Sequence, residues 1–225
     1  MEKSCRDGVI GAGGIVVPPV VYQRGFPDAL RAQAAELYDA VFGQKLALAI
    51  PCREKRLQLL AASFRPDHCF VAMQGDALVG IAGFKSAQGA FTGGMNFDAL
   101  VHHVGHVGAW RAAVVLSIYD PPLRRRQLLL DRIVVADSAR GQGIGSQLLE
   151  IIKNHAAHTG CRRVRLYVID TNHTAKRLYK RHGFRQTATI NLMLLRWLLG
   201  FSRNLTMEFF IPRKARQVRP VRIYS

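Results

Sequence analysis

The chain of 225 residues is long enough for one well-buried core, and a hydrophobic content of 49% without a low-complexity tract predicts a single folded unit rather than a disordered or fibrous chain. Its 32 Lys and Arg against 15 Asp and Glu give a formal net charge of +17, which suits a ligand bearing several phosphates or a polyanionic partner such as nucleic acid or an anionic membrane. The four cysteines lack C-x-x-C spacing, which argues against a zinc site and a disulfide framework and favours a reducing, cytoplasmic setting.

The first part of the chain predicts helices followed by a hairpin. Residues 1–14 carry four glycines and little periodic signal, so we expect a flexible N-terminal arm. A first strand follows at 15–22, where Pro18 and Pro19 favour an edge position. Hydrophobic spacing then predicts helices at 26–42 and 53–64, and two strands at 69–73 and 77–84 joined at Gln74-Gly75-Asp76.

An insert at 85–127 separates this hairpin from the next strand, and its residues 97–115 are apolar at helical spacing. After the insert we expect four strands, at 128–135, 163–169, 186–190 and 205–211. Two helices are expected between them, at 146–158 and 174–182. A very apolar run at 192–201 is interrupted by Arg196 and is too short to cross a bilayer, so no membrane span is predicted. We therefore expect a domain over 15–211 and a basic tail at 212–225.

The segment between the strand 128–135 and the following helix reads Arg140-Gly141-Gln142-Gly143-Ile144-Gly145-Ser146. A glycine-rich turn that leaves a strand and opens a helix lets the backbone approach a ligand closely, and the first helical N–H groups carry a partial positive charge. Arg140 adds a guanidinium group that suits phosphate oxygens. The segment therefore predicts a loop that binds pyrophosphate.

Three nucleotide-binding patterns compete for this loop. A Walker A loop ends in Gly-Lys-Ser/Thr, whereas Ser146-Gln147 follows the glycines here, so no lysine reaches the terminal phosphates. A dinucleotide-binding loop needs G-x-G-x-x-G and an acidic residue about 20 positions on, but the third glycine stands one position early and Asp170 lies at the wrong distance. The third pattern, [Gln/Arg]-x-x-Gly-x-[Gly/Ala], is filled by Arg140, Gly143 and Gly145.

A second motif follows the strand 163–169. Its pattern is N-x-x-A-x-x-L/F-Y-x-x-x-G-F, and the marked positions are Asn172, Ala175, Leu178, Tyr179, Gly183 and Phe184. With the glycine loop at the usual spacing upstream, the chain resembles the GCN5-related N-acetyltransferase (GNAT) superfamily, closely over 128–184 and more loosely over 15–211. The resemblance implies an α/β fold with a mixed, mostly antiparallel sheet of six or seven strands, flanked by helices and opened at a V between 128–135 and 163–169.

The resemblance also implies acetyl-coenzyme A as co-substrate and no metal. Its pyrophosphate would bind the loop formed by Arg140, Gly141, Gln142, Gly143, Ile144, Gly145 and Ser146. A backbone N–H of Ile133, Val134 or Val135 would polarise the thioester carbonyl, while Asn172, Ala175 and Tyr179 would contact the cofactor arm. Structural alternatives stand beside these roles, because residues 133–135 also suit a core strand, Asn172 a helix N-cap and Ala175 simple packing.

Tyr179 is the candidate general acid, because a phenol with a pKa of about 10 can protonate a departing thiolate; the alternative is a core tyrosine. Asp131 is the candidate general base, since it is the only acidic side chain between residues 123 and 135. An ion pair with Arg132, or a proton relay through ordered water, remains the alternative. The histidines at 102, 103 and 106 lack a second ligand cluster, so positions on a loop or helix face are favoured over a metal site.

These features predict direct transfer of an acetyl group to a primary amine of a small molecule or a protein, in a ternary complex. The apolar segments 97–115 and 192–201 are expected to wall the acceptor cleft, with a homodimer interface as the competing role. Acidic residues are few, which argues against a polycationic acceptor. Aromatic residues are not interleaved with the basic ones, so no specific nucleic acid is predicted. The alternative function is a catalytically idle acyl-CoA sensor or interaction module.

Overall fold

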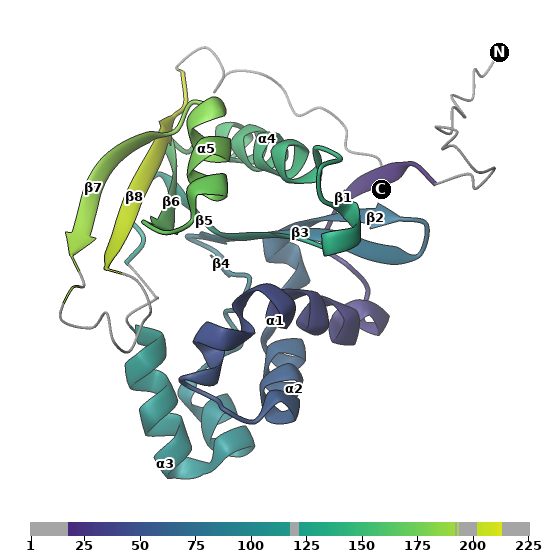
Figure 1. Ribbon diagram of the computed structural model, residues 1–225, viewed down its shortest axis with the longest axis vertical. Helices are drawn as coiled ribbons and strands as arrows, with labels where there is room; N and C mark the ends of the chain where they lie inside the picture. Colours follow the sequence, from purple (N-terminus) through teal and green to yellow (C-terminus); the bar gives the residue numbers. More distant parts are fainter. Residues whose placement is uncertain (1–17, 118–121, 192, 194–201, 213–225) are drawn as a thin grey trace.

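The computed structural model describes residues 18–117, 122–191, 193 and 202–212 (Figure 1). The predicted N-terminal arm, all but the first residue of the predicted basic tail, and most of the apolar run 192–201 therefore lie outside the described residues. None of the helices in the described ranges is long and apolar enough to cross a membrane.

The architecture is an eight-stranded mixed sheet with helices on both faces, as the family resemblance implies. Among the strands of the described residues, β5 and β6 run parallel and the other neighbouring pairs are antiparallel. A two-residue strand, β4 (Gly89–Ala90), pairs only with β3 and accounts for the strand beyond the predicted seven. The main path across the sheet is β1 (Val20–Arg24), β2 (Cys69–Gln74), β3 (Ala77–Ser86), β5 (Gln127–Val135), β6 (Arg163–Ile169), β8 (Arg203–Phe210) and β7 (Arg185–Asn191).

Two groups of helices sandwich this sheet. Figure 1 shows α4 (Ile144–His158) and α5 (His173–Arg181) on its upper side. The lower side carries α1 (Arg31–Ala47), α2 (Arg53–Ser63) and α3 (Phe97–Ser117). The insert helix α3 packs against α2 rather than directly on the sheet, through a cluster formed by Ala49, Ile50, Leu59, Leu100, Ala109 and Ala112. The insert therefore thickens the lower helical layer.

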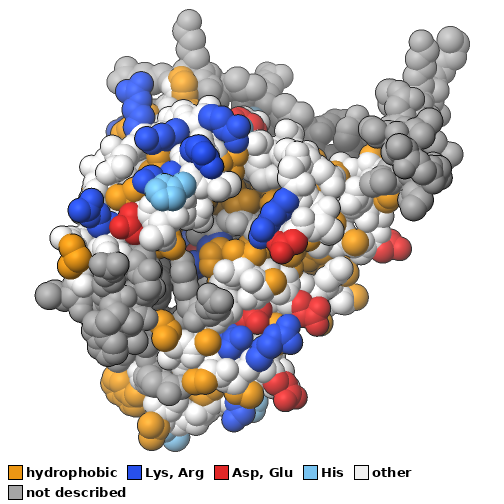
Figure 2. Space-filling model, in the orientation of Figure 1, with side chains coloured by type: hydrophobic (Ala, Val, Ile, Leu, Met, Phe, Trp, Pro, Cys, Tyr) orange, Lys and Arg blue, Asp and Glu red, His pale blue; other side chains and the backbone are white. Residues whose placement is uncertain are grey.

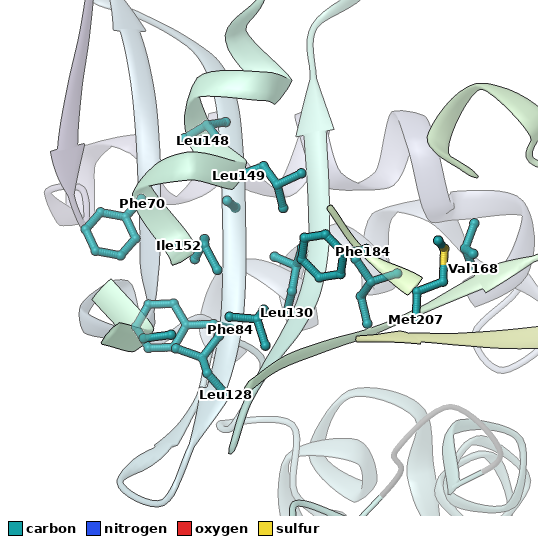
Figure 3. Packing of buried hydrophobic residues seen from close by; sticks show 14 of the residues in the cluster. Phe70, Phe84, Leu128, Leu130, Leu148, Leu149, Ile152, Val168, Phe184 and Met207 are labelled. Atoms are coloured by element: carbon teal, nitrogen blue, oxygen red, sulfur yellow. The ribbon is translucent and has the colours of Figure 1, made fainter. Parts of the chain in front are cut away.

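The main core lies between α4 and the sheet. Helix α4 presents Ile144, Leu148 and Ile152 at intervals of four residues, which places them on one face of the helix. All three side chains are fully buried, together with Leu149. Figure 3 shows this helix face packed on aromatic and aliphatic side chains of the sheet, namely Phe70, Phe84, Leu128 and Leu130. The end of α4 that follows the glycine loop is thus fixed to the sheet by close packing.

The predicted elements exist, and the largest differences in bounds are those of β1 and α1, which both begin and end later than expected. The first strand begins at Val20 and is an edge strand, as the prolines predicted. The first helix starts at Arg31 instead of residue 26, because Asp28–Leu30 forms a short 3₁₀ turn. Helix α4 begins at Ile144 instead of Ser146, so two residues of the glycine loop belong to its first turn. The insert helix spans Phe97–Ser117 as one element with a break at Gly105, whose φ is 72°.

A buried ion pair joins two helices of the lower layer, α1 and α2. Arg56 on α2 donates to Asp39 on α1 at 2.5 Å (Nε–Oδ1) and 3.2 Å (Nη2–Oδ2), and both side chains are buried. Arg56 also donates to the carbonyl of Ile50 at 2.9 Å. Arg53 reaches the same carboxylate at 3.5 Å, but its side chain is 66% exposed. The two arginines therefore form a matched pair that differs in burial.

We expect Arg56→Ala to lower the free energy of unfolding by about 3–5 kcal/mol, because it leaves the Asp39 carboxylate buried without its main partner. Arg53→Ala is the matched control and should cost at most about 1 kcal/mol, since water screens its interaction. Urea unfolding followed by circular dichroism measures both. Equal losses in the two variants would contradict the ranking by burial.

Candidate active site

The two parallel strands in the middle of the sheet separate partway along their length. Strand β5 pairs with β6 at Gln127, Leu128 and Leu129, and the pairing ends there although both strands continue. The predicted V between these strands is therefore present. A cavity of about 190 Å³ lies where they separate. Five of the sequence-predicted site residues line it, namely Asp131, Ile133, Asn172, Ala175 and Tyr179.

The glycine loop connects the end of β5 to the start of α4. Gly141 and Gly143 have φ angles of 82° and 79°, a left-handed conformation that a residue with a side chain adopts only with strain. A Cβ added at either glycine would meet no atom within 4 Å, so the space beside this backbone is open. Gly143 is the N-cap of α4, which leaves the first N–H groups of the helix turned toward that space. The loop therefore has the geometry of an anion-binding helix start.

The other loop residues divide between core and surface. The Ile144 side chain is buried in the core, so only its backbone is available to a ligand. Gln142 is exposed and Ser146 is half-buried. Arg140 is 60% exposed, and its guanidinium lies 2.7 Å from the Asp137 carboxylate. That exposed pair leaves the guanidinium close to the loop and accessible from solvent.

Gly145 connects the loop with the separated strands. A Cβ on this residue would lie 3.8 Å from Val135 and 3.9 Å from both Ile133 and Leu178. The first turn of α4 thus lies beside the end of β5 and beside α5. Val134 pairs with Ile81 of β3 and its side chain is buried, whereas Ile133 and Val135 are half-buried. The side chains of residues 133–135 contribute to packing, and their backbone borders the opening.

Tyr179 lies on α5 and lines the cavity. Its ring is half-buried, with its centroid 5.9 Å from that of Phe184. Burial raises the pKa of the Tyr179 hydroxyl to about 12, and the positive charge of Arg132 opposes this shift. The hydroxyl is therefore protonated at neutral pH and is available as a proton donor.

Asn172 begins the same helix as its N-cap. Its Oδ1 accepts a hydrogen bond from the backbone N–H of Ala175 at 3.0 Å. This is the structural role that the sequence left open, and it also holds Asn172 and Ala175 together at the cavity wall. The position of α5 is thus fixed at the end that faces the site.

Asp131 lies at a β-bulge in the middle of β5. Gly83 of β3 pairs with Arg132 and Phe84 pairs with Leu130, so Asp131 is the extra residue between two successive pairs. Its Oδ1 lies 3.8 Å from Nε of Arg132, at the long end of an ion pair. Asp131 and Arg132 line both the cavity at the V and a second cavity of about 630 Å³ on the side of α1, α2 and α3. The bulge therefore places both side chains between two cavities.

Arg132 is a residue whose place at the centre of the site the sequence did not indicate. Its guanidinium lies 4.4 Å from the ring centroid of Phe42 on α1, and it hydrogen-bonds Tyr38 of the same helix. Burial raises the pKa of the Tyr38 hydroxyl, and Asp131 adds to that rise whereas Arg132 opposes it. A charged residue inside an otherwise apolar strand was the available signal. The contacts that Phe42 and Tyr38 make with Arg132 left no signal in the sequence, because α1 is distant from β5 along the chain.

Asn204 on β8 is a second residue that the sequence missed. It lines the cavity at the V, and its buried Oδ1 accepts no hydrogen bond from the part of the chain that the structure describes. An unsatisfied buried carbonyl oxygen is costly, and a ligand N–H group would satisfy it. An asparagine in a strand does not mark a binding site in the sequence, because the register of β8 alone decides which of its side chains faces the opening.

The predicted histidines lie on the insert helix. His102 and His103 have ring centroids 5.1 Å apart, and Nδ1 of His103 is 2.8 Å from the carbonyl oxygen of Ala99. Within the described ranges, no group of three or more His, Cys, Asp or Glu side chains is placed to hold a metal ion. These histidines lie on a helix face, as the sequence favoured.

The second cavity lies where the strands β3, β4 and β5 meet the lower helices. Phe97, Leu100 and Ala113 of the insert helix line it, as do the cationic side chains Arg65 and Lys85. The outer face of the helix carries Val107 and Trp110, which are 87% and 67% exposed. Figure 2 shows hydrophobic side chains over the lower end of the molecule, where this helix lies. The role expected of this segment, a wall of the acceptor cleft, stays a prediction, and so does the homodimer interface that competes with it.

Comparisons with known proteins agree with this arrangement. The sequence model described as "Acetyltransferase (GNAT) family" matches residues 33–184. A solved acetyltransferase structure from Salmonella typhimurium, described with its cofactor acetyl-CoA, superposes with a TM-score of 0.54 at 15% identity, covering 86% of this chain and 95% of that one. At this identity the similarity shows the fold alone.

Two relatives are more similar in sequence. A mouse protein named "Probable N-acetyltransferase family 8 member 5" is 30% identical over 151 residues, which cover 65% of this chain and 61% of the mouse protein. A cattle thialysine N-epsilon-acetyltransferase is 41% identical over 58 residues, covering 26% of this chain and 34% of that protein. The matches thus span less than two thirds of either relative. Because the family match covers more than half of the chain and contains both motifs, the chain belongs to the GNAT family of acetyltransferases.

Proposed function

We propose that this chain transfers an acetyl group from acetyl-CoA directly to a primary amine in a ternary complex. The observation that carries the proposal is the cavity at the V, which gathers Asp131 and Ile133 from β5 with Ala175, Tyr179 and the N-cap Asn172 from α5. Acyl transfer to an amine uses a proton donor for the thiolate, a carboxylate that accepts the amine proton and a backbone N–H that polarises the thioester carbonyl. The residues at this opening can supply all three.

The residues around the loop fit acetyl-CoA. Open, left-handed glycines at 141 and 143 expose backbone N–H groups at the start of α4, which suits a pyrophosphate. Arg140 adds a charge-assisted donor from the surface. A Cβ added at Gly145 would lie 3.9 Å from Ile133 and Leu178, so a larger side chain at this position would enter the space between the loop and the separated strands. An extended cofactor arm bound between β5 and α5 would use that space.

Tyr179 and Asp131 have complementary roles in this proposal. Tyr179 is protonated at neutral pH and donates its proton to the thiolate as the carbon–sulfur bond breaks, and water then returns a proton to the tyrosine oxygen. Asp131, or an ordered water beside it, takes the proton that the amine loses. Because Asp131 borders both cavities, it can reach an amine that approaches from the side of the lower helices.

The second cavity is the proposed entrance for the acceptor. Its lining combines apolar side chains of α3 with three cations (Arg65, Lys85 and Arg132) and one carboxylate, Asp131. Such a lining repels a polycation and suits a single primary amine attached to an apolar group. The name of the cattle relative, which specifies thialysine, is compatible with a small amine acceptor.

The test is release of free thiol from acetyl-CoA in the presence of a panel of primary amines, with detection of the acetylated amine. Acetyl transfer to at least one amine supports the proposal. An idle acyl-CoA sensor is the alternative function, and it would bind acetyl-CoA without releasing thiol above the rate of spontaneous hydrolysis.

Asp131→Asn separates the two possible proton acceptors. We expect kcat/KM to fall roughly tenfold, below the full effect of general-base catalysis because water still accepts some of the protons. Asp76→Asn in the exposed hairpin turn is the matched control, and it should leave kcat/KM unchanged. A variant Asp131→Asn with wild-type kcat/KM would assign the role to water alone.

A further inference from the structure

A third cavity, distinct from the two described above, is polar and lies at the end of the sheet opposite the glycine loop. Its volume is about 460 Å³, within the usual range for small-molecule sites. It is lined by residues from the end of β1, the turn before β2, the end of β3, the start of β5 and the end of α4. The nine-residue strand β5 separates it from the glycine loop by roughly 25 Å, at about 3.3 Å per residue.

The lining of this cavity is strongly cationic. Arg24, Arg124, Arg125 and Arg126 contribute to it, whereas Asp67 is its only acidic residue among those that the structure describes. Asp67 already lies 2.9 Å from Nδ1 of His68, and its backbone carbonyl accepts two hydrogen bonds from Arg24. An adjoining cavity is lined by Arg125, Arg126, Arg162 and Arg163. This concentration of guanidinium groups favours a ligand that carries phosphate.

Gln127 gives the cavity a second polar feature. The residue is only 3% exposed, and it lines the cavity together with the arginines. Neither Nε2 nor Oε1 has a hydrogen-bond partner within the described part of the chain. A buried amide without partners costs stability, and this cost calls for an explanation such as a bound ligand. The amide offers a donor to a phosphate oxygen and an acceptor to a hydroxyl group beside it.

The neighbouring groups are consistent with an anion site. Arg126 has a φ of 53°, a left-handed conformation that is uncommon for a residue with a side chain. Burial lowers the pKa of His155 to about 4, with Arg24, His158 and His68 adding to the shift, so His155 is neutral at neutral pH. The arginines therefore supply positive charge to the cavity, and His155 supplies none.

We infer that this cavity binds a small phosphate ester with a hydroxyl group near the phosphate, such as a sugar phosphate or a nucleotide. The phosphate is held by Arg125 and Arg126, and the ester's hydroxyl donates to Oε1 of Gln127. A membrane surface or a nucleic acid would meet the exposed arginines but would not reach an amide that is buried within the cavity. The inference does not rest on the proposed acetyl transfer.

Binding is tested on the full chain with saturating coenzyme A present, which occupies the glycine loop. Ribose 5-phosphate and AMP are the probes, and ribose at matched ionic strength is the control. Isothermal calorimetry should detect binding of at least one probe and none of ribose. Failure of both probes overturns the inference, and so does equal binding of ribose.

Two variants locate the site. Gln127→Leu should weaken probe binding roughly tenfold or more while the unliganded protein keeps or raises its Tm, because an unpaired buried amide is replaced by an apolar group of similar size. A fall in Tm without loss of binding would give Gln127 a structural role and overturn the inference. The double variant R125A/R126A changes two exposed residues, so it should not disturb the core. Its affinity for the probe should also fall at least tenfold.

Arg185→Ala removes one exposed positive charge on β7, away from the cavity, and is the matched control. Loss of binding equal to that of R125A/R126A would mean that net charge alone attracts the probe, which overturns the inference. Anionic lipid vesicles and single-stranded RNA form the last arm. Binding of either one through Arg125 and Arg126, without binding of the probes, would assign the surface to a polyanion instead.

Discussion

Replacing Gly143 with leucine is expected to abolish the thermal stabilisation that acetyl-CoA gives the protein. At a concentration 100-fold above its Kd, a ligand stabilises the folded state by about 2.7 kcal/mol, which corresponds to roughly 5–10 °C in Tm for a chain of this size. A leucine side chain at Gly143 would occupy the open space that the loop leaves beside the first N–H groups of α4. The pyrophosphate would then be displaced from the helix start.

The substitution also strains the backbone, because the φ of Gly143 is 79°. Gly75→Leu is the matched control, since Gly75 has a φ of 60° in the hairpin turn and its added Cβ would make only an ordinary contact of 3.5 Å with Pro18. Both variants should have a lowered Tm without ligand, and only Gly143→Leu should lose the increase produced by acetyl-CoA. Thermal denaturation with and without acetyl-CoA measures both effects. A folded Gly143→Leu protein with the full increase would exclude the loop as the cofactor site.

The fold was predictable from sequence because local signals and the global arrangement agree. The hairpin residues 74–76, the helical spacing of 53–64 and the alternation of 163–169 each specify an element that the structure contains. The register was not predictable. The bulge at Asp131 arises where Gly83 and Phe84 pair with residues on either side of it, and no local pattern in 128–135 encodes that shift. The starts of α1 and α4 were also missed, at residue 26 instead of Arg31 and at residue 146 instead of Ile144.

The candidate site was predictable only where it lies on continuous motifs. The glycine loop and the residues from Asn172 to Tyr179 each form a continuous motif. The structure brings Gly145 beside Ile133 and Leu178, next to the cavity that Asn172, Ala175 and Tyr179 line. Phe42, Tyr38 and Asn204 come from distant elements, and only the tertiary fold brings them to Arg132 and the cavity. Contacts of this kind depend on which helix covers which face of the sheet, which hydrophobic periodicity does not specify.

Tyr179→Phe is expected to lower kcat by roughly 10²-fold or more while the affinity for acetyl-CoA stays close to that of the wild type. The phenylalanine ring keeps the packing against Phe184, so the change removes only the hydroxyl group that donates the proton. Burial raises the pKa of Tyr179 to about 12, so the hydroxyl is protonated across the usual assay range. We therefore expect the loss of kcat in Tyr179→Phe to be the same at every pH in that range.

Tyr167→Phe is the matched control, because Tyr167 on β6 lines the same cavity and the substitution removes the same atom. Its kcat should stay within about threefold of the wild type, since the proposed chemistry uses only the hydroxyl of Tyr179. Single-turnover measurements with saturating acetyl-CoA isolate the acetyl-transfer step from product release. Because the thiolate is the leaving group, a thioester whose thiol has a lower pKa needs less protonation and should restore part of the rate of Tyr179→Phe. Equal losses in both tyrosine variants, or a wild-type rate in Tyr179→Phe, would reduce Tyr179 to a packing residue.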